Sequence, residues 1–152
     1  MTAEPASAKT ILSLPRIVGA SCAAALVAAT INTLLPVTAV AAFETPAAFE
    51  PLAWSAVVIA SVIGALGAGA CFAILSRLVR RLVPVFLVVV GAGLVASMYP
   101  PIALAFADPL PYPGTEMGAV TTLMLMHVVV AVTSTAFLVR AVPTQPSAGG
   151  PR

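Results

Sequence analysis

The chain has 152 residues, of which 61% are hydrophobic and 8% are charged, and its mean hydropathy is +1.10. Soluble domains carry about 25% charged residues, so this composition excludes a soluble globular protein. The formal net charge of +2 is too small to indicate a nucleic-acid partner. We therefore expect a single-domain integral membrane protein whose main partner is the lipid bilayer.

Apolar segments long enough to span a bilayer occur four times in the sequence. The hydrocarbon core is ~30 Å thick and needs about 20 apolar residues in a helix, which satisfies its own backbone groups in lipid. The apolar runs do not alternate as the strands of an outer-membrane barrel would. The sequence predicts an all-α membrane protein with a bundle of four antiparallel transmembrane helices in residues 13–140, and its spans cover about 16–43, 52–76, 82–107 and 117–139.

The first span follows residues 1–12, which we expect to form a disordered cytoplasmic tail. Asn32 lies near the middle of this span, four residues before Pro36. A basic start, an apolar stretch and small residues near its end also resemble a secretory signal with a cleavage site. The stretch is longer than the usual ~7–15 apolar residues, and cleavage stays an open alternative.

The second span contains Gly64, Gly67 and Gly69. Small residues let helices approach closely in lipid, which suits either packing within one bundle or homodimerisation. Packing within the bundle is favoured because neighbouring helices of the same chain are already at hand.

A short basic hinge separates the second and third spans and contains Arg77, Arg80 and Arg81. All seven cationic residues lie in this hinge or in the two terminal segments, whereas four of the five acidic residues lie in the other two loops. Short loops rich in Lys and Arg stay on the cytoplasmic side of a membrane. The three arginines are therefore the expected topology determinants of a multi-pass protein of the bacterial plasma (inner) membrane, with cytoplasmic N and C termini.

The third span carries Pro100 and Pro101 near its outer end. Two prolines remove two backbone hydrogen bonds, so we expect a kink or unwinding there. Thr115 and Glu116 predict a capped start for the fourth span. Residues 141–152 are rich in Pro, Gly, Ser and Thr and are expected to form a disordered cytoplasmic tail.

The single histidine, His127, lies in the fourth span, about 16 Å of helix beyond Glu116 and about 20 Å before Arg140. Ionisable side chains near the bilayer centre are costly and usually face the bundle interior. Helical spacing puts six residues on the most polar face of this span: Glu116, Val120, Leu123, His127, Ala131 and Ser134.

Asn32 lies at a similar depth, so we predict that His127 forms a hydrogen bond in or near the Asn32 turn. The candidate intramembrane polar site is then His127, Asn32, Glu116 and Ser134. A neutral imidazole could simply join the first and fourth spans. Alternatively, the same group could serve a proton relay or a ligand contact in a small transporter.

No motif for catalysis or metal binding appears in the sequence. No nucleotide-binding loop, Ser/His/Asp arrangement or HExxH is present, and two cysteines with one distant histidine make no recognised metal site. We therefore expect a protein that is not an enzyme and has no cofactor and no metal.

The segment from Thr122 to Ala131, together with Asn32 and the arginine hinge, resembles an uncharacterised family of small four-span actinobacterial membrane proteins, classed as a domain of unknown function. That resemblance implies no substrate or catalytic residue. The preference for Arg over Lys and the abundance of Ala, Val, Gly and Pro agree with a GC-rich bacterial source. We expect a non-enzymatic membrane scaffold or accessory subunit with a membrane-protein partner or a homo-oligomeric state; the alternative is a small transporter or proton-linked permease that uses His127 and Asn32.

Overall fold

The computed structural model describes residues 12–43, 49–107, 112, 113 and 115–143, and every regular element within them is helical. The helices are α1 (Leu14–Phe43), α2 (Trp54–Leu78), α3 (Leu82–Ser97), α4 (Tyr99–Ala105) and α5 (Met117–Arg140), and a short 3-10 helix, η1 (Glu50–Leu52), precedes α2. The prediction of an all-α fold with four long apolar helices packed together is confirmed.

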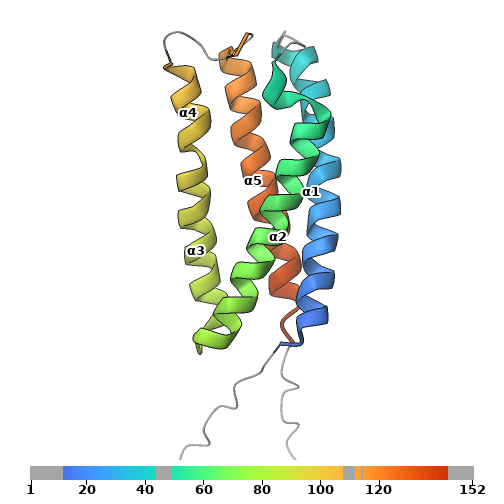
Figure 1. Cartoon of the computed structure of the whole chain (residues 1–152), viewed down its shortest axis with the longest axis vertical. Coiled ribbons are helices and arrows are strands. Elements are labelled where there is room, and N and C mark those ends of the chain that lie inside the picture. Colours follow the sequence, from blue (N-terminus) through green and yellow to red (C-terminus); the bar gives the residue numbers. More distant parts are fainter. Residues whose placement is uncertain (1–11, 44–48, 108–111, 114, 144–152) are drawn as a thin grey trace, which may run out of the picture.

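Four segments of the described chain are long and apolar enough to cross a membrane: α1, α2, α3 together with α4, and α5. Successive spans run in opposite directions, and α5 ends at the end of the bundle where α1 begins (Figure 1). We name this the hinge end, because residues 79–81 connect α2 to α3 there, and the opposite end the far end. The chain is a multi-pass membrane protein with four spans.

The third span is interrupted at its two consecutive prolines, and the predicted kink is confirmed. α3 ends at Ser97, Met98 forms a turn, and α4 begins at Tyr99. Pro100 and Pro101 then lie in the first turn of α4, where a helix needs no amide donor. By contrast, α1 continues through Pro36 without a break, since it loses only one backbone hydrogen bond.

Helices α1, α2 and α5 form the closely packed part of the bundle (Figure 1). Gly69 of α2 faces α1 so closely that an added Cβ would overlap the hydroxyl of Ser21. A Cβ on Gly64 would lie 2.9 Å from Cγ1 of Val130 on α5. These two glycines therefore serve packing within one chain, as expected, whereas a Cβ on Gly67 would have nothing within 4 Å.

The span formed by α3 and α4 is attached more loosely, to α2 and α5. Only 6% of its most apolar stretch is buried, against 33% for α1. Near the hinge end Phe86 of α3 packs edge to face against Phe72 of α2, with ring centroids 4.7 Å apart. From this contact α2 and α3 diverge toward the far end (Figure 1).

The packed bundle extends slightly beyond the predicted limits of 13–140. Leu12 is buried in a cluster with Ile17, Phe72, Phe86 and Leu138, and Val142 packs against the same cluster. Leu12 and Val142, which flank the first and last helices, thus cover the aromatic pair Phe72 and Phe86, a contact that the sequence does not reveal. The remainder of the two predicted tails, residues 1–11 and 144–152, lies outside the described residues.

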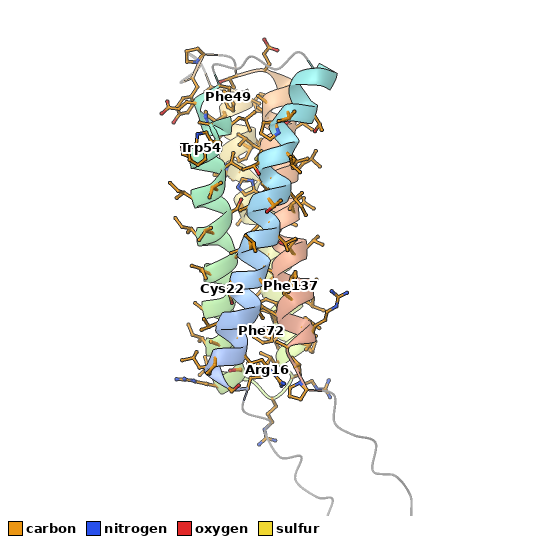
Figure 2. The ribbon with its side chains drawn as sticks, turned by 90° about the vertical axis from the view of Figure 1, so that its right-hand side faces the viewer. Arg16, Cys22, Phe49, Trp54, Phe72 and Phe137 are labelled. Atoms are coloured by element: carbon orange, nitrogen blue, oxygen red, sulfur yellow. The ribbon has the colours of Figure 1, made fainter. Side chains whose placement is uncertain are left out.

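Arginines and acidic side chains lie at opposite ends of the described bundle. Arg16 lies at the hinge end, and Trp54 lies exposed at the far end (Figure 2). The exposed arginines of the hinge, Arg77, Arg80 and Arg81, share the end of Arg16, and the described acidic residues, Glu50 and Glu116, lie at the far end. Glu44 and Asp108, which were part of the predicted charge separation, lie outside the described residues.

The predicted side-chain cap of the fourth span is wrong. Glu116 occupies the N-cap position of α5 without a capping hydrogen bond from its side chain. The hydroxyl of Thr115 instead donates to the carbonyl oxygen of Tyr112 at 2.8 Å, because it reaches back into the preceding loop.

Candidate functional site

Asn32 joins three helices at the middle of the bundle. Its amide nitrogen donates to Ser61 Oγ of α2 at 3.0 Å and to the carbonyl oxygen of Met126 of α5 at 3.2 Å. Ser61 Oγ in turn donates to the carbonyl oxygen of Val57 at 2.7 Å. Both amide hydrogens of Asn32 are therefore used, and its side chain is 1% exposed.

The amide oxygen of Asn32 has no such partner. Among the described residues, Asn32 Oδ1 and Ser134 Oγ are the buried side-chain atoms that lack a hydrogen bond. Leaving a buried acceptor unpaired costs about 1–3 kcal/mol relative to water. Such an atom therefore marks a position where a further donor would be accommodated.

His127 forms its hydrogen bond within its own helix. Nδ1 lies 2.7 Å from the carbonyl oxygen of Leu123, and because a carbonyl only accepts, Nδ1 carries a proton. In the neutral ring Nε2 is then an acceptor, and the described part of the chain provides no partner for it.

The predicted hydrogen bond between His127 and the Asn32 turn does not form directly. Asn32 binds the carbonyl of Met126, the residue immediately before His127, so the two side chains lie at one level of the bundle. The reason is geometric: the imidazole finds a carbonyl one turn back in α5, while the amide reaches the α5 backbone itself.

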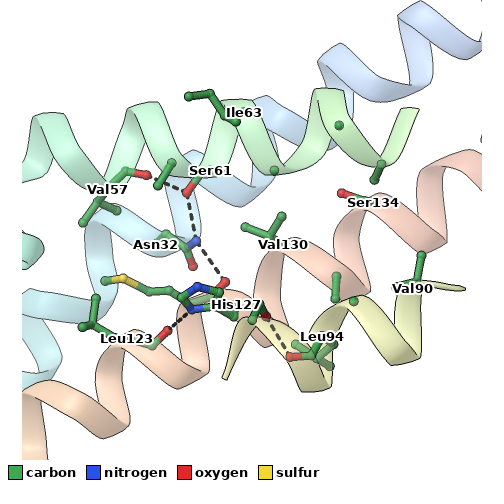
Figure 3. Close-up of a pocket in the computed structure, with 18 of the residues that line it drawn as sticks. Asn32, Val57, Ser61, Ile63, Val90, Leu94, Leu123, His127, Val130 and Ser134 are labelled. Atoms are coloured by element: carbon green, nitrogen blue, oxygen red, sulfur yellow. Dashed lines mark hydrogen bonds between the residues drawn. The ribbon is translucent and has the colours of Figure 1, made fainter. Parts of the chain in front are cut away.

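A cavity of about 660 Å³ lies beside these residues, between α2, α3 and α5 (Figure 3). Its walls are mainly apolar, with Val57, Val90, Leu94 and Val130 among the lining residues. Several lining residues of α2 and α3 are largely exposed, including Ile63 and Val89 at 65% and 40%. The cavity is therefore open to the surroundings between α2 and α3.

Three of the four predicted site residues line this cavity: Asn32, His127 and Ser134. The side chain of Ser134 is fully buried and its hydroxyl is unpaired. Glu116 is exposed at the N-cap of α5 and is not among the lining residues. The polar face predicted for the fourth span thus lines the cavity from Leu123 to Ser134. The first turn of α5, next to Glu116, does not.

Sequence reasoning missed Ser61, which is 2% exposed and holds the Asn32 amide. The available signal was a hydroxyl at the middle of the second span, at the depth predicted for Asn32. Lining residues on α3, such as Gly93 and Ser97, had no signal because the contacts of that span depend on the bundle geometry.

The arrangement suits binding rather than metal chemistry. The described residues contain no group of three or more His, Cys, Asp or Glu side chains that could hold a metal ion. Among the described residues, the cavity lining contains no Asp, Glu, Lys or Arg. What the site offers is a large apolar surface and a few hydrogen-bonding atoms.

A protein-family model described as a family of unknown function (DUF6069) matches residues 12–144. The match covers all four spans and coincides with the packed bundle from Leu12 to Val142. No curated protein and no solved structure matches the chain.

Proposed function

We propose that this protein, which belongs to the DUF6069 family of unknown function, is a non-enzymatic membrane protein that binds a neutral, lipid-soluble small molecule in the cavity between α2, α3 and α5. The observation that carries the proposal is the cavity of about 660 Å³, lined by apolar side chains and by Asn32, His127 and Ser134. Small-molecule sites in proteins typically have volumes of ~300–1,000 Å³ and a mainly apolar lining with a few polar groups.

The opening between α2 and α3 supports entry from the bilayer. The α3–α4 span has little buried surface, and exposed residues of α2 and α3 form the rim of the cavity. In a membrane this rim faces hydrocarbon, where a lipid-soluble molecule is already concentrated. Such a ligand reaches the polar atoms at the centre of the bundle without crossing a charged surface.

The small transporter or proton-linked permease remains a second candidate, because it would use the same cavity beside His127. Passage across the membrane requires access from both ends of the bundle. Phe86 lines the cavity, is fully buried and packs on the equally buried Phe72, near the hinge end. This arrangement supports binding more directly than passage.

A role as a pure scaffold or accessory subunit predicts a tightly packed centre throughout. The close contacts of α2 with α1 at Gly69 and with α5 at Gly64 support it, but the cavity departs from it. An accessory subunit that binds a ligand within a larger membrane complex would account for both the close helix contacts and the cavity. We keep the accessory role in this sense.

We further propose that the protein lies in the plasma membrane of a bacterium, of actinobacterial origin, with the hinge end in the cytoplasm. The orientation is supported by the arginines at the hinge end, because short loops rich in Lys and Arg stay in the cytoplasm. Fusions after Arg140 test the orientation: green fluorescent protein should fluoresce and alkaline phosphatase should stay inactive. Active phosphatase at this position would reverse the assignment.

The binding function is tested with a photoreactive eight-carbon alcohol that carries a diazirine, applied to the purified protein in detergent micelles. Gly93 lines the cavity, and Gly91 lies on the same helix outside the lining; an added Cβ at either position would meet nothing within 4 Å. Gly93→Trp should place an indole ring in the cavity, where it obstructs the bound molecule, and Gly91→Trp should leave the cavity open.

Mass spectrometry should find the label on lining peptides of α2, α3 and α5 in the wild type and in Gly91→Trp, and at least about tenfold less in Gly93→Trp. Equal labelling of both variants, or labelling spread over the whole lipid-facing surface, would overturn the proposal. A second copy or another protein in the cavity would show itself as a stable oligomer whose lining peptides stay unlabelled.

A further inference from the structure

The cavity offers hydrogen-bond acceptors that have no donor. Asn32 Oδ1 is buried without a partner among the described residues, although the amide nitrogen of Asn32 makes two hydrogen bonds. His127 donates through Nδ1 to Leu123, which leaves Nε2 of a neutral ring as an acceptor. Both residues line the cavity, and the bond from Asn32 to the carbonyl of Met126 fixes them at one level.

We infer that the ligand of this cavity is an apolar molecule with a neutral hydrogen-bond donor, a hydroxyl or N–H group, which donates to His127 Nε2 or to Asn32 Oδ1. This inference rests on the proposed function and adds the chemical class of the ligand. An apolar body alone would leave both acceptors unpaired. A hydroxyl, with its one proton, satisfies one of them, and a primary amide, with two N–H bonds, can satisfy both.

The second unpaired group lies deeper in the same cavity. Ser134 follows His127 by seven residues on α5, which corresponds to a rise of roughly 10 Å toward the hinge end. Its buried hydroxyl has no partner and can donate or accept. A ligand with a second oxygen or nitrogen about 10 Å from its donor group would engage both levels.

Charged ligands are disfavoured by the lining itself. None of the lining residues in the described part of the chain is Asp, Glu, Lys or Arg, so neither an ammonium nor a carboxylate would meet a fixed counter-charge there. Burying an unpaired charge costs far more than one hydrogen bond returns. The structure therefore assigns the site to alcohols, phenols or amides rather than to fatty acids or amines.

The test compares the photoreactive alcohol with its methyl ether, which has the same chain and diazirine but no donor. Specific labelling is the part that Gly93→Trp abolishes, and the two probes are compared at equal concentration in the micelle, so that their different partitioning does not affect the ratio. The wild type should prefer the alcohol about tenfold, the ratio expected for a hydrogen bond made in a dry site.

His127→Phe keeps an aromatic side chain but removes Nε2. Because the histidine bonds only to its own helix, this variant should fold. Its preference for the alcohol should fall about threefold or more. Leu125→Phe, at an exposed position outside the lining, should keep the full preference.

The outcomes separate the two claims. Equal labelling by alcohol and ether, with loss of both in Gly93→Trp, overturns the donor inference and leaves the binding proposal standing. Labelling by neither compound overturns the binding proposal itself. An excess of unlabelled octanoate that competes better than octanol would overturn the assignment to neutral ligands.

Discussion

The amide nitrogen of Asn32 on α1 lies 3.2 Å from the carbonyl oxygen of Met126 on α5. Through this bond and a second one to Ser61, one side chain connects three of the four spans at mid-depth. In lipid, helices gain little from hydrophobic burial against one another, so such bonds and close packing determine their arrangement. Substitutions that remove these bonds or disturb this packing should therefore change the stability of the bundle.

Replacement of Asn32 should loosen the bundle. Asn32→Leu removes both interhelical hydrogen bonds and should lower the free energy of unfolding by about 1–2 kcal/mol. The measurement is unfolding in mixed micelles of increasing SDS content. Thr30→Val is the control, since the exposed Thr30 hydroxyl bonds only to Leu26 of its own helix. Equal losses in both variants would contradict the bridging role.

Gly69 should be sensitive to a single methyl group. A Cβ there would overlap the Ser21 hydroxyl, so Gly69→Ala should cost about 1–3 kcal/mol of unfolding free energy. Gly67→Ala meets open space and should cost less than about 0.5 kcal/mol. Adding Ser21→Gly to Gly69→Ala should recover most of the loss, and failure to recover would show that another contact is responsible.

His127 should matter little for stability. Its imidazole bonds to Leu123 of the same helix, so His127→Phe should change the unfolding free energy by less than about 1 kcal/mol. Thermal unfolding of the purified protein, monitored by helical circular dichroism, measures this. A loss as large as that of Asn32→Leu would indicate an interhelical bond of His127, as the sequence originally predicted.

The aromatic pair should anchor the loosely attached span. Phe86→Ala removes the contact with Phe72 and should cost about 3 kcal/mol, because a fully buried ring leaves a void. Val88→Ala, at a position 71% exposed, is the control and should cost less than about 0.5 kcal/mol.

Hydrogen exchange should locate the effect of Phe86→Ala in α3, because this contact holds α3 against α2. The amides of α3 should exchange faster, while those of α1 should keep their protection. Uniform loss of protection along all helices would contradict a local anchoring role.

Much of the candidate site could be predicted from the sequence, because Asn and His each occur once in it and both lie within apolar spans. Asn32, His127 and Ser134 were identified in this way, and all three line the cavity. Their exact partners were not predictable: Asn32 bonds to a serine and to a backbone carbonyl, and neither choice follows from helical spacing. Glu116 shares the helical face of His127 but lies beyond the cavity.

By itself, the sequence determined that this chain crosses the membrane as four helices and where the third span breaks, because hydropathy, length and proline act locally along the chain. Only the tertiary structure decided that α1, α2 and α5 pack closely while α3 stands apart and leaves a cavity beside His127. The physical reason is that lipid is as apolar as the helices. Side-chain fit and a few hydrogen bonds, rather than hydrophobicity, select which faces meet.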